Sequence, residues 1–420
     1  MLLKFSLPLL CMLFASLASA QTVRQVPGEW PNIQSAIDAS RNGDTVVVDA
    51  GTYFERIDFR GRDILVRSVR GPGLTVIDGA GAGPVVQFRS GESRAAMLDG
   101  FTITHGQHAL YAGGVHIADA SPTLSNNRIV ENLGGRHGHG ISILRSTNAL
   151  IVSNQISGNR SAPMASGAGG GGGIGVGGAG RVEIRANRIS ANRVTRLSSG
   201  GGIFLNYAGA TQVIGNLIDD NSTRLEGAGI AIFGSSEARI ENNQISGNRV
   251  IEPGKGGGVS WLLLPGSQAP AVINNTLAQN YAEQGSGIYA DGDDSRAQIV
   301  NNLLLAAPGQ SAIECGEFYD PMPPRVRHNN AVSDSEAYAG SCSDALGSHG
   351  NRSIEERFGA QNYRLVAGSS SIDAGENIAA IERVDLAGQA RIRDGNHDHD
   401  ARIDIGAFEF GAPLTAPGLQ

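Results

Sequence analysis

The sequence has few aromatic residues, only three cysteines and, beyond residue 20, a single lysine. Aromatic residues make up 5% of the 420 residues, and Lys255 is the one lysine that follows Lys4. The 33 Lys and Arg residues face 40 Asp and Glu residues, which gives a formal charge of −7 at pH 7. A mildly acidic chain without clustered lysines lacks the basic surface that nucleic-acid binding needs. We therefore expect no nucleic-acid partner.

Long apolar runs are also missing after the first 20 residues. Residues 1–20 have a basic start at Lys4, an apolar run to Leu17 and the ending Ala18-Ser19-Ala20, which is the pattern of a cleaved secretory signal. No later run is long enough to be a membrane span. We therefore expect an exported monomer, extracellular or periplasmic, that is cleaved after Ala20 and does not cross a membrane.

Helical periodicity is nearly absent, and a repeated phrase takes its place. The phrase Asn-x-Ile/Leu-x-x-Asn occurs six times between Asn127 and Asn280, and its first asparagines are 27, 33, 29, 27 and 32 residues apart. A second phrase, glycine followed by Ile or Val, keeps the same period from Gly114 to Gly287. Two phrases locked to one period indicate a repeat protein.

Each period contains short runs of β-branched residues. Ile141, Ile143, Ile151 and Ile156 fall in such runs, which predicts two or three short strands joined by turns. Such a unit cannot bury its apolar face alone, but coils stacked at the strand spacing of about 4.8 Å enclose a continuous core. The sequence therefore predicts an all-β solenoid, a parallel β-helix of about ten coils.

The two phrases are expected to have different roles in this solenoid. Asparagine at a turn can adopt the left-handed conformation, and stacked amides can hydrogen-bond along a column. Glycine marks tight corners where a Cβ atom would clash. We therefore expect a structural asparagine ladder beside a column of corner glycines.

The regions around the repeats predict the domain boundaries. Residues 31–41 place Ile33, Ala36 and Ile37 on one face and end at Asn42-Gly43, which predicts a short amphipathic helix that caps the first coil. The predicted regions are a signal peptide (1–20), an N-terminal cap (21–44), the β-helix (45–346), a small C-terminal β module (347–410) and a flexible tail (411–420).

Short segments near both ends resemble known families. Residues 33–37 (IQSAI), 43–48 (GDTVVV), 51–55 (GTYFE) and 99–103 (DGFTI) resemble the opening of the pectin-lyase-like right-handed parallel β-helix superfamily. Residues 371–375 (SIDAG), 385–388 (DLAG) and 404–409 (DIGAFE) resemble the choice-of-anchor Q module. The first resemblance implies a right-handed β-helix. It does not specify an activity, because the superfamily holds lyases, hydrolases, esterases, epimerases and proteins without known catalysis.

Two cysteines remain after the signal segment, Cys315 and Cys342. They are 27 residues apart, which is one repeat, so stacked coils would place their Cα atoms within the range of a disulfide. In an exported protein a disulfide is favoured over two free thiols.

Five of the nine histidines fall within 35 residues. The candidate catalytic residues are His116, His139, Arg136 and Glu131, and the candidate ligand-binding residues are His105, His108, His137 and Arg145. Imidazole, carboxylate and guanidinium groups on one face can bind a uronate or sulfate and move protons. The alternative interpretation is a chance cluster of exposed histidines on turns.

His139 is the one large residue in a column of small ones. The other residues directly before the repeat glycines are Gly113, Gly172, Gly201, Ala228, Gly257 and Ser286. We therefore expect the His139 ring to project outward. If His139 binds an acidic sugar together with His116 and Arg136, affinity should weaken as the pH rises through the ordinary histidine pKa of about 6.5.

An acidic loop near the C-terminus has alternating oxygen-bearing side chains, Asp394, Asn396, Asp398 and Asp400. This spacing is typical of loops that wrap Ca²⁺. The loop is not an EF-hand, because His399 and Ile405 stand where an EF-hand has Gly and Glu. The alternatives are a plain solvated turn and a transition-metal site that uses His397 and His399. No other cofactor is expected.

Two functions remain open from the sequence. The first is an exported protein that binds or processes an extracellular polysaccharide along the solenoid face; as an enzyme it would be a polysaccharide lyase or a glycoside hydrolase. The second is a non-catalytic surface protein, adhesin-like or a scaffold. An enzyme should concentrate charged and aromatic residues in one groove, whereas a scaffold should spread them.

Overall fold

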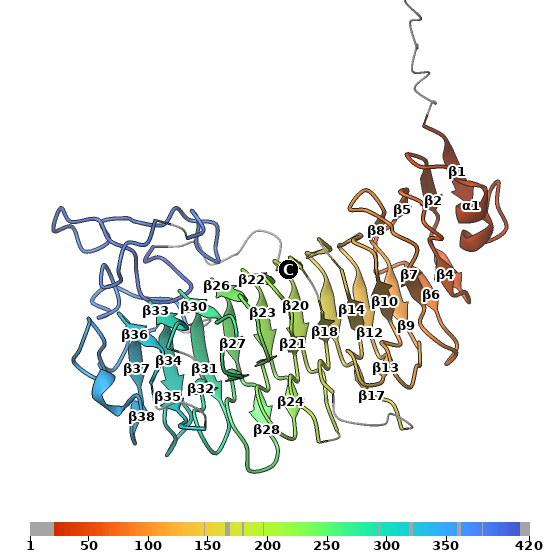
Figure 1. The fold of residues 1–420 in the computed structure, drawn as a ribbon. Helices are drawn as coiled ribbons and strands as arrows, with labels where there is room; N and C mark the ends of the chain where they lie inside the picture. The colour runs from red at the N-terminus through yellow and green to blue at the C-terminus, as the bar shows by residue number, and fades with distance from the viewer. Residues whose placement is uncertain are drawn as a thin grey trace, which may run out of the picture.

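The computed structural model describes residues 21–411 except residues 147, 164–168, 179, 196, 293–294, 319–321, 359–362 and 380. The predicted signal peptide and nearly all of the predicted tail lie outside the described residues. The chain winds as a solenoid whose coils stack along one axis, as Figure 1 shows. Every ladder between named strands is parallel, for example Val115↔Ile141 and Ile141↔Ile174. The predicted parallel β-helix is confirmed.

Each coil contributes one strand to each of three sheets of 12, 11 and 11 strands. Sheet 1 contains β1 (Val23–Val26), β2 (Thr45–Val48), β5 (Leu65–Ser68), β8 (Met97–Asp99), β11 (Thr123–Ser125), β15 (Leu150–Val152), β19 (Glu183–Arg185), β22 (Gln212–Ile214), β26 (Arg239–Glu241), β30 (Ala271–Ile273), β33 (Gln298–Val300) and β36 (Arg325–Arg327). Sheet 2 contains β4 (Ile57–Asp58), β7 (Val86–Phe88), β10 (Val115–Ala118), β14 (Ile141–Leu144), β18 (Ile174–Gly177), β21 (Ile203–Asn206), β25 (Ile230–Phe233), β29 (Val259–Leu263), β32 (Ile288–Gly292), β35 (Ile313–Cys315) and β38 (Tyr338–Gly340). Sheet 3 contains β3 (Gly51–Tyr53), β6 (Thr75–Asp78), β9 (Thr102–Thr104), β12 (Arg128–Val130), β16 (Gln155–Ser157), β20 (Arg188–Ser190), β23 (Leu217–Asp219), β27 (Gln244–Ser246), β31 (Thr276–Asn280), β34 (Leu303–Ala306) and β37 (Asn330–Val332).

Two short strand pairs lie outside these sheets, β13 (Leu133–Gly134) with β17 (Arg160–Ser161) and β24 (Ser222–Thr223) with β28 (Arg249–Val250). They follow sheet 3 in their coils and form a fourth side of the solenoid. This side was not predicted from the sequence, because its strands have only two residues each and carry no apolar alternation of useful length.

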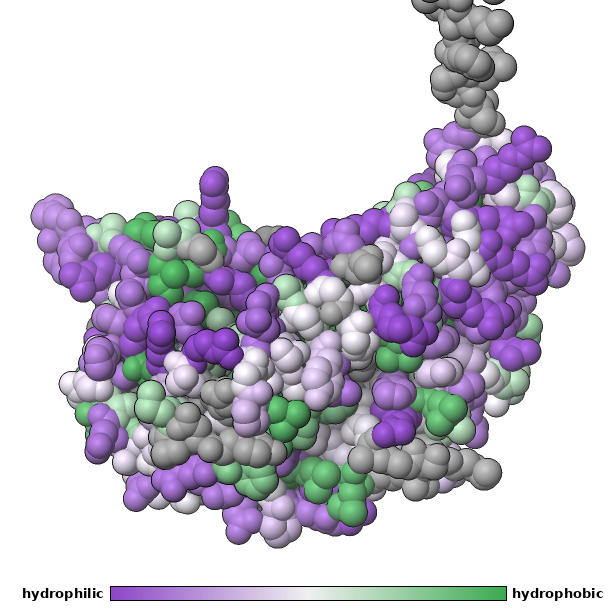
Figure 2. Space-filling view, in the orientation of Figure 1, coloured by the Kyte–Doolittle hydropathy of each residue, from purple (hydrophilic) through white to green (hydrophobic). Residues whose placement is uncertain are grey.

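The core is a column of aliphatic side chains inside the coils. In β14, Ile141 and Ile143 are fully buried and stack on Val115 and Ile117 of β10. Ser142, between them, points to the opposite side of the sheet. Figure 2 shows hydrophilic residues over the N-terminal coils and the C-terminal segment, and a paler surface over the middle coils. Apolar burial therefore follows the repeat, while hydrophilic residues gather toward the two ends of this face.

Two ladders of buried asparagines run along the solenoid, as expected. In the first, Asn216 donates from its backbone N and from Nδ2 to Oδ1 of Asn243, each at 2.9 Å, and from Nδ2 to the Ile184 carbonyl at 2.9 Å. The same bonds recur from Asn127 to Asn351. The second ladder runs from Asn132 to Asn280 through Asn159, Asn192, Asn221 and Asn248.

The left-handed turn residue is not the ladder asparagine, which corrects one detail of the sequence analysis. It is the residue before the asparagine, such as Asn126 with a φ of 53° or Asn242 with a φ of 54°. The asparagine itself is thereby turned inward, where its amide bonds to the coils on both sides. The corner glycines do avoid a clash, since a Cβ atom on Gly140 would lie 2.8 Å from the Gly173 carbonyl oxygen.

The N-terminal cap contains the expected helix, α1, which spans Ile33–Ala39 and is shorter than the predicted 31–41. Asn32 caps it by accepting from the Ser35 N–H group at 2.8 Å. The carboxylate of Glu55 accepts from the Ile33 N–H group at 2.9 Å. Because the apolar face of α1 is buried, the helix covers the first coils as a terminal repeat requires.

The two cysteines are joined at the C-terminal end of the solenoid. Cys315 ends β35, and Cys342 lies directly before the short 3₁₀ helix η1 (Ser343–Ala345). Their Cα atoms are 5.4 Å apart in the disulfide. The bond therefore links the end of β35 to the segment directly after β38, the last strand of sheet 2.

Residues 347–411 fold back along the solenoid (Figure 1). Their described part forms isolated bridges such as Val384↔Ala390 rather than regular strands. The segment docks beside the left-handed turns of the first ladder: the side chain of Asn242 donates to the Val384 carbonyl at 2.8 Å, and Gly406 N donates to the Asn301 carbonyl at 2.8 Å. Polar groups of the turns thus hold the segment against the coils.

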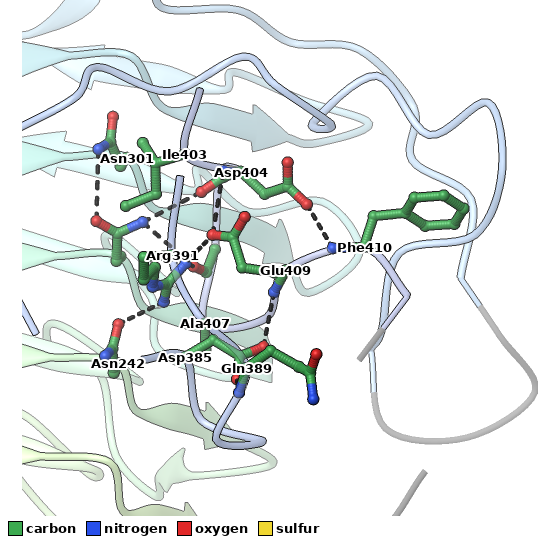
Figure 3. Close-up of polar contacts among 12 residues, drawn as sticks. Asn242, Asn301, Asp385, Gln389, Arg391, Ile403, Asp404, Ala407, Glu409 and Phe410 are labelled. Atoms are coloured by element: carbon green, nitrogen blue, oxygen red, sulfur yellow. Dashed lines mark hydrogen bonds and ion pairs between the residues drawn. The ribbon is translucent and has the colours of Figure 1, made fainter. Parts of the chain in front are cut away.

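A buried charged cluster pins this segment, as Figure 3 shows. Arg391 pairs with Glu409 at 2.8 Å, and the two side chains are 2% and 1% exposed. Arg391 also donates to Oδ1 of Asn242 on the solenoid. Burial and the neighbouring Glu409 raise the pKa of Asp404 to about 7. We name Arg391, Glu409, Asp404 and Asp385 the C-terminal clamp.

Candidate functional site

Two columns of outward residues form a strip along sheet 2, which we name the outer strip. The strand column follows the sheet register through His116, Ser142, Gly175, Phe204, Ala231, Ser260, Tyr289 and Glu314. The loop column lies three residues before each repeat glycine and contains His137, Gly170, Ser199, Glu226, Lys255 and Gln284.

The loop column packs over the strand column. A Cβ atom on Gly170 would lie 2.7 Å from Cγ of Phe204, so only glycine leaves room for this ring. At other coils the two columns meet through larger side chains, as the Lys255 Nζ atom does 4.4 Å from the centre of the Tyr289 ring. Polar groups therefore gather at the two ends of the outer strip, and small residues and Phe204 occupy its middle.

At one end, Tyr111 brings together three of the predicted histidines. Its ring is 4.2 Å from that of His116, 5.1 Å from that of His108 and 6.5 Å from that of His137, measured between centroids. Nδ1 of His116 is 2.8 Å from the hydroxyl of Ser142. His108 is fixed as well, because its Nδ1 accepts from the backbone N–H group of Tyr111 at 3.0 Å. This histidine–tyrosine end is a stacked, ordered group.

Burial keeps these imidazoles neutral. It lowers the pKa of His116 to about 4, assisted by the charges of His108, Arg89 and Arg145. Burial also lowers the pKa of His108 and of His137, the latter with a contribution from Arg136. Neutral imidazoles offer no positive charge to an acidic sugar at pH 7. His116 is already neutral at pH 6.5, so its titration cannot cause the expected loss of affinity for an acidic sugar near that pH.

His139 does not project, so this expectation is wrong. Its side chain is buried, 2% exposed, and its Nε2 lies 3.5 Å from the Ser161 hydroxyl of β17. The physical reason is the fourth side of the solenoid, because the residue before each repeat glycine faces that side and is covered by it. In a later coil, Ala228 fills the same column and packs on Val250 of β28. Burial lowers the pKa of His139 to about 4.

His105 and Glu131 lie apart from the histidine–tyrosine end. Both occupy left-handed turn positions, with φ values of 54° and 57°. Nδ1 of His105 is 2.8 Å from Asp78, and its Nε2 is 3.6 Å from Glu131. The hydrogen bond to Asp78 raises the pKa of His105. This exposed group is an ion-paired turn rather than part of the outer strip.

The two predicted arginines also take separate places. Arg145 forms a two-pronged pair with Asp119, at 2.8 and 2.6 Å, and 61% of its side chain is exposed. Arg136 lies in the loop directly before His137 and is exposed. Because Asp119 already neutralises Arg145, that side chain is not a free cation for an anionic ligand.

The other end of the outer strip contains a second polar group, which the sequence analysis missed. Glu226, Lys255 and Gln284 lie in register on adjacent coils. Lys255 donates to the Tyr289 hydroxyl at 2.8 Å and lies 3.8 Å from the carboxylate of Asp291. We name these five residues the lysine end.

Strands and backbone groups hold the lysine end in place. Asp291 is 4% exposed and accepts from the N–H groups of Gly292 and Phe318, each at 2.9 Å, and from the Tyr289 hydroxyl at 3.1 Å. Gln284 donates to Glu314 at 2.7 Å. Burial raises the pKa of Glu226, as does the nearby Asp291 charge, while Lys255 opposes the rise. An ammonium and a carboxyl group with a raised pKa thus lie side by side and partly exposed.

One signal in the sequence pointed to this end. Lys255 is the one lysine after residue 20, and it falls three residues before Gly258 of the glycine column. The histidine cluster is visible in the sequence because five histidines fall within 35 residues of the chain. The lysine end is built from residues of three adjacent coils, with Glu226 and Lys255 in separate coils and Gln284, Tyr289 and Asp291 in a third, and the register between coils brings them together.

The predicted calcium loop uses its oxygens on its own backbone. The carboxylate of Asp394 accepts from the N–H groups of Asp398 and His399, at 3.1 and 3.0 Å. Asn396 Oδ1 accepts from Asp398 N at 2.9 Å, and Asp398 accepts from Asp400 N at 2.8 Å. Within the described residues, no three Asp, Glu, His or Cys side chains converge as a metal site. Calcium binding stays a prediction, as does the alternative metal site at His397 and His399.

Comparison with known proteins identifies the family. The model described as the right handed beta helix region matches residues 91–304, so the chain belongs to this family of right-handed β-helix proteins. Among solved structures, the crystal structure of pectate lyase Pel9A is similar, with a TM-score of 0.50 and 17% sequence identity over 93% of this chain and 97% of that chain. At this identity the likeness concerns the fold. No curated protein sequence matches the chain.

Proposed function

We propose that the protein is exported and binds an extracellular polysaccharide along the outer strip, with the polymer axis parallel to the solenoid axis. The lysine end is the observation that carries this proposal. It gathers titratable and aromatic groups at one place on a long, regular face, which is the distribution expected of a binding or processing site rather than of a scaffold.

The chemistry of the lysine end suits a sugar. Each sugar hydroxyl donates one hydrogen bond and accepts others, so it is satisfied by a neighbouring acceptor and donor. Glu226 supplies an acceptor, Lys255 supplies a donor, and Gln284 supplies both on the next coil. The histidine–tyrosine end adds the aromatic surface of Tyr111 beside neutral imidazoles.

Processing of the polymer is a further part of the proposal. A carboxyl group with a raised pKa is suited to act as a general acid near neutral pH, and Glu226 has this property. As an enzyme the protein would be a glycoside hydrolase or a polysaccharide lyase. The alternative is a non-catalytic surface or scaffold protein. One observation supports it: Asp291 is deeply buried, accepts three hydrogen bonds and is closed to a substrate.

The remaining assignments also stay proposals. Residues 1–20 as a signal peptide support export, and no helix in the described part of the chain is long and apolar enough to cross a membrane. Residues 347–410 are proposed to be a choice-of-anchor Q-like module. Calcium at the Asp394–Asp400 loop would be supported by a melting temperature that rises with added Ca²⁺ in the parent but not in an Asp398→Asn variant.

The test is a panel of acidic and neutral polysaccharides, read by affinity electrophoresis and by assays for unsaturated products and new reducing ends. Lys255→Met should weaken binding about tenfold, because it removes one charged hydrogen-bond donor. The control is Arg60→Gln, which removes an exposed cation paired with Asp38 at the N-terminal cap and should leave binding unchanged. Equal binding by the parent and Lys255→Met would refute the assigned site.

A further inference from the structure

A row of exposed arginines lies on the fourth side of the solenoid. The residue after each asparagine of the second ladder forms a column in register over six coils, which contains Leu133, Arg160, Arg193, Ser222, Arg249 and Tyr281. Arg160, Arg193 and Arg249 are exposed, and 40% of Tyr281 is exposed. We name this column the arginine row.

The guanidinium groups of the row are not neutralised by the described residues. None of the three arginines forms an ion pair with a residue that the structure describes, whereas other exposed arginines such as Arg60 and Arg188 pair with aspartates at 2.9 Å. Arg249 instead lies over the Tyr281 ring, 4.3 Å from its centroid.

A column of turn residues lies beside the arginine row. Two residues before the row, the coils carry Glu131, Gly158, Ala191, Asp220, Gly247 and Gln279, all six at left-handed positions with positive φ. The acids stand in the coils whose row residue is Leu133 or Ser222. The three coils with an arginine have Gly158, Ala191 and Gly247 at this position, and the acids of the neighbouring coils extend over two of these glycines: a Cβ atom on Gly247 would lie 2.7 Å from Oδ1 of Asp220, and one on Gly158 would lie 4.0 Å from Cγ of Glu131. These acids lie near the row without forming an ion pair with its arginines among the described residues.

This arrangement costs stability in the unliganded protein. Arg160 and Arg193 are direct neighbours across a parallel bridge, and like charges in that position repel. Flexible side chains in water reduce the repulsion but do not make it favourable. An anion between the two guanidinium groups turns this repulsive interaction into an attractive one, since each arginine can donate two parallel hydrogen bonds to a carboxylate or sulfate.

We propose that the arginine row is a binding surface for an anionic polysaccharide whose carboxylate or sulfate groups recur along the solenoid axis. Neighbouring row positions are one coil apart, about 4.8 Å, which is close to the length of one sugar unit in an extended chain. The Tyr281 ring at the end of the row offers an apolar face for a sugar ring. The surface holds the polymer, and no chemical step is assigned to it.

The row is separate from the outer strip, and the two sites share no residue. A nucleic acid is a poorer partner, because its dense phosphates need a broad basic patch. The row is one residue wide and is flanked by Glu131 and Asp220, on a chain whose net charge is −7.

The test compares the parent with the triple variant Arg160→Gln/Arg193→Gln/Arg249→Gln. The probes are dextran sulfate, which carries only sulfate groups, polygalacturonate, which carries only carboxylates, and uncharged dextran, measured by biolayer interferometry at low and high salt. We expect the parent to bind at least one anionic probe and not dextran. The triple variant should bind at least about tenfold more weakly, because three exposed charge contacts each contribute roughly 0.5 kcal/mol or more. Added salt should weaken binding by the parent more than binding by the variant.

The control is the triple variant Arg60→Gln/Arg188→Gln/Arg402→Gln, which removes the same charge from exposed arginines that are paired with aspartates. An equal loss of binding in this control, or no loss in the row variant, would overturn the proposal. So would an oligonucleotide that binds as tightly as dextran sulfate.

A structural role for the row predicts a lower free energy of unfolding in Arg193→Gln, whereas relief of repulsion predicts an equal or higher one. Loss of neutral-glycan binding in Lys255→Met has no bearing on this result, so the two sites fail independently.

Discussion

At the scale of single residues, His116 and His139 are held in the fold as neutral imidazoles. Each has a folded-state pKa of about 4 because of burial, while an unfolded chain restores the ordinary value of about 6.5. The unfolded state therefore binds more protons between these two values. The stability that this shift provides is complete above pH 6.5 and is lost as the pH falls toward 4.

We expect His116→Gln to reduce the acid sensitivity of the fold. Between pH 7 and pH 5, the parent should lose about 2 kcal/mol of unfolding free energy at His116 alone, and the variant should not lose this amount. Urea unfolding at the two pH values measures the difference. His105→Gln is the matched control with the opposite sign, because its pKa is raised by Asp78 and it stabilises the fold at low pH. Equal pH dependence in His116→Gln and the parent would contradict the account.

The buried asparagines give a second prediction at this scale. Asn216→Ala removes the acceptor for two donors of Asn187, at 2.9 and 3.0 Å, and the donor for the Ile184 carbonyl. Because these partners are buried, we expect a loss of about 2 to 4 kcal/mol in unfolding free energy. Asn396→Ala, on an exposed loop, is the control and should change little. An Asn216→Ala protein as stable as the parent would show that the ladder does not support the fold.

At the scale of elements, the repeat phrases predicted the ladders and the corner glycines, because each depends on one position per coil. The same phrases gave the wrong orientation for the His139 ring, since the fourth side of the solenoid, which covers that ring, has strands of two residues with no periodicity to detect. They also missed the lysine end, whose members Glu226, Lys255 and Tyr289 come from separate coils. Register decides which side chains meet, and insertions between repeats conceal the register in the sequence.

The C-terminal clamp gives a prediction about an element and its docking. Arg391→Met leaves the buried carboxylate of Glu409 without its partner, in contact with a neighbour, Asp404, that is also acidic. Breaking such a pair costs about 3 to 5 kcal/mol, and we expect the cost to fall on the docking of residues 347–411. Limited proteolysis should then remove this segment and leave the solenoid intact. Arg402→Gln, at an exposed pair with Asp400, is the control. A segment that resists the protease in Arg391→Met would show that the clamp does not hold it.

At the scale of the whole molecule, the solenoid turns a sequence period into parallel lines of side chains. The asparagine ladders, the outer strip and the arginine row are three such lines, and they differ in burial rather than in construction. The ladders are fully buried and stabilise the fold. The arginine row is exposed, while the outer strip is partly exposed at His137, Phe204, Glu226, Lys255 and Gln284 and buried along most of its strand column. The repeating spacing of both along the axis matches a polymer better than a small molecule.

The central claim is that a polysaccharide lies along the outer strip, and a series of oligosaccharides of increasing length tests it most directly. The loop column from His137 to Gln284 spans five coil steps, or roughly 24 Å. For the polysaccharide that binds best, isothermal titration calorimetry should give a dissociation constant that falls with each added sugar unit up to about five units and then levels off. A dissociation constant that no longer changes beyond two units would contradict the account, because the ligand would then occupy a single pocket and not the strip.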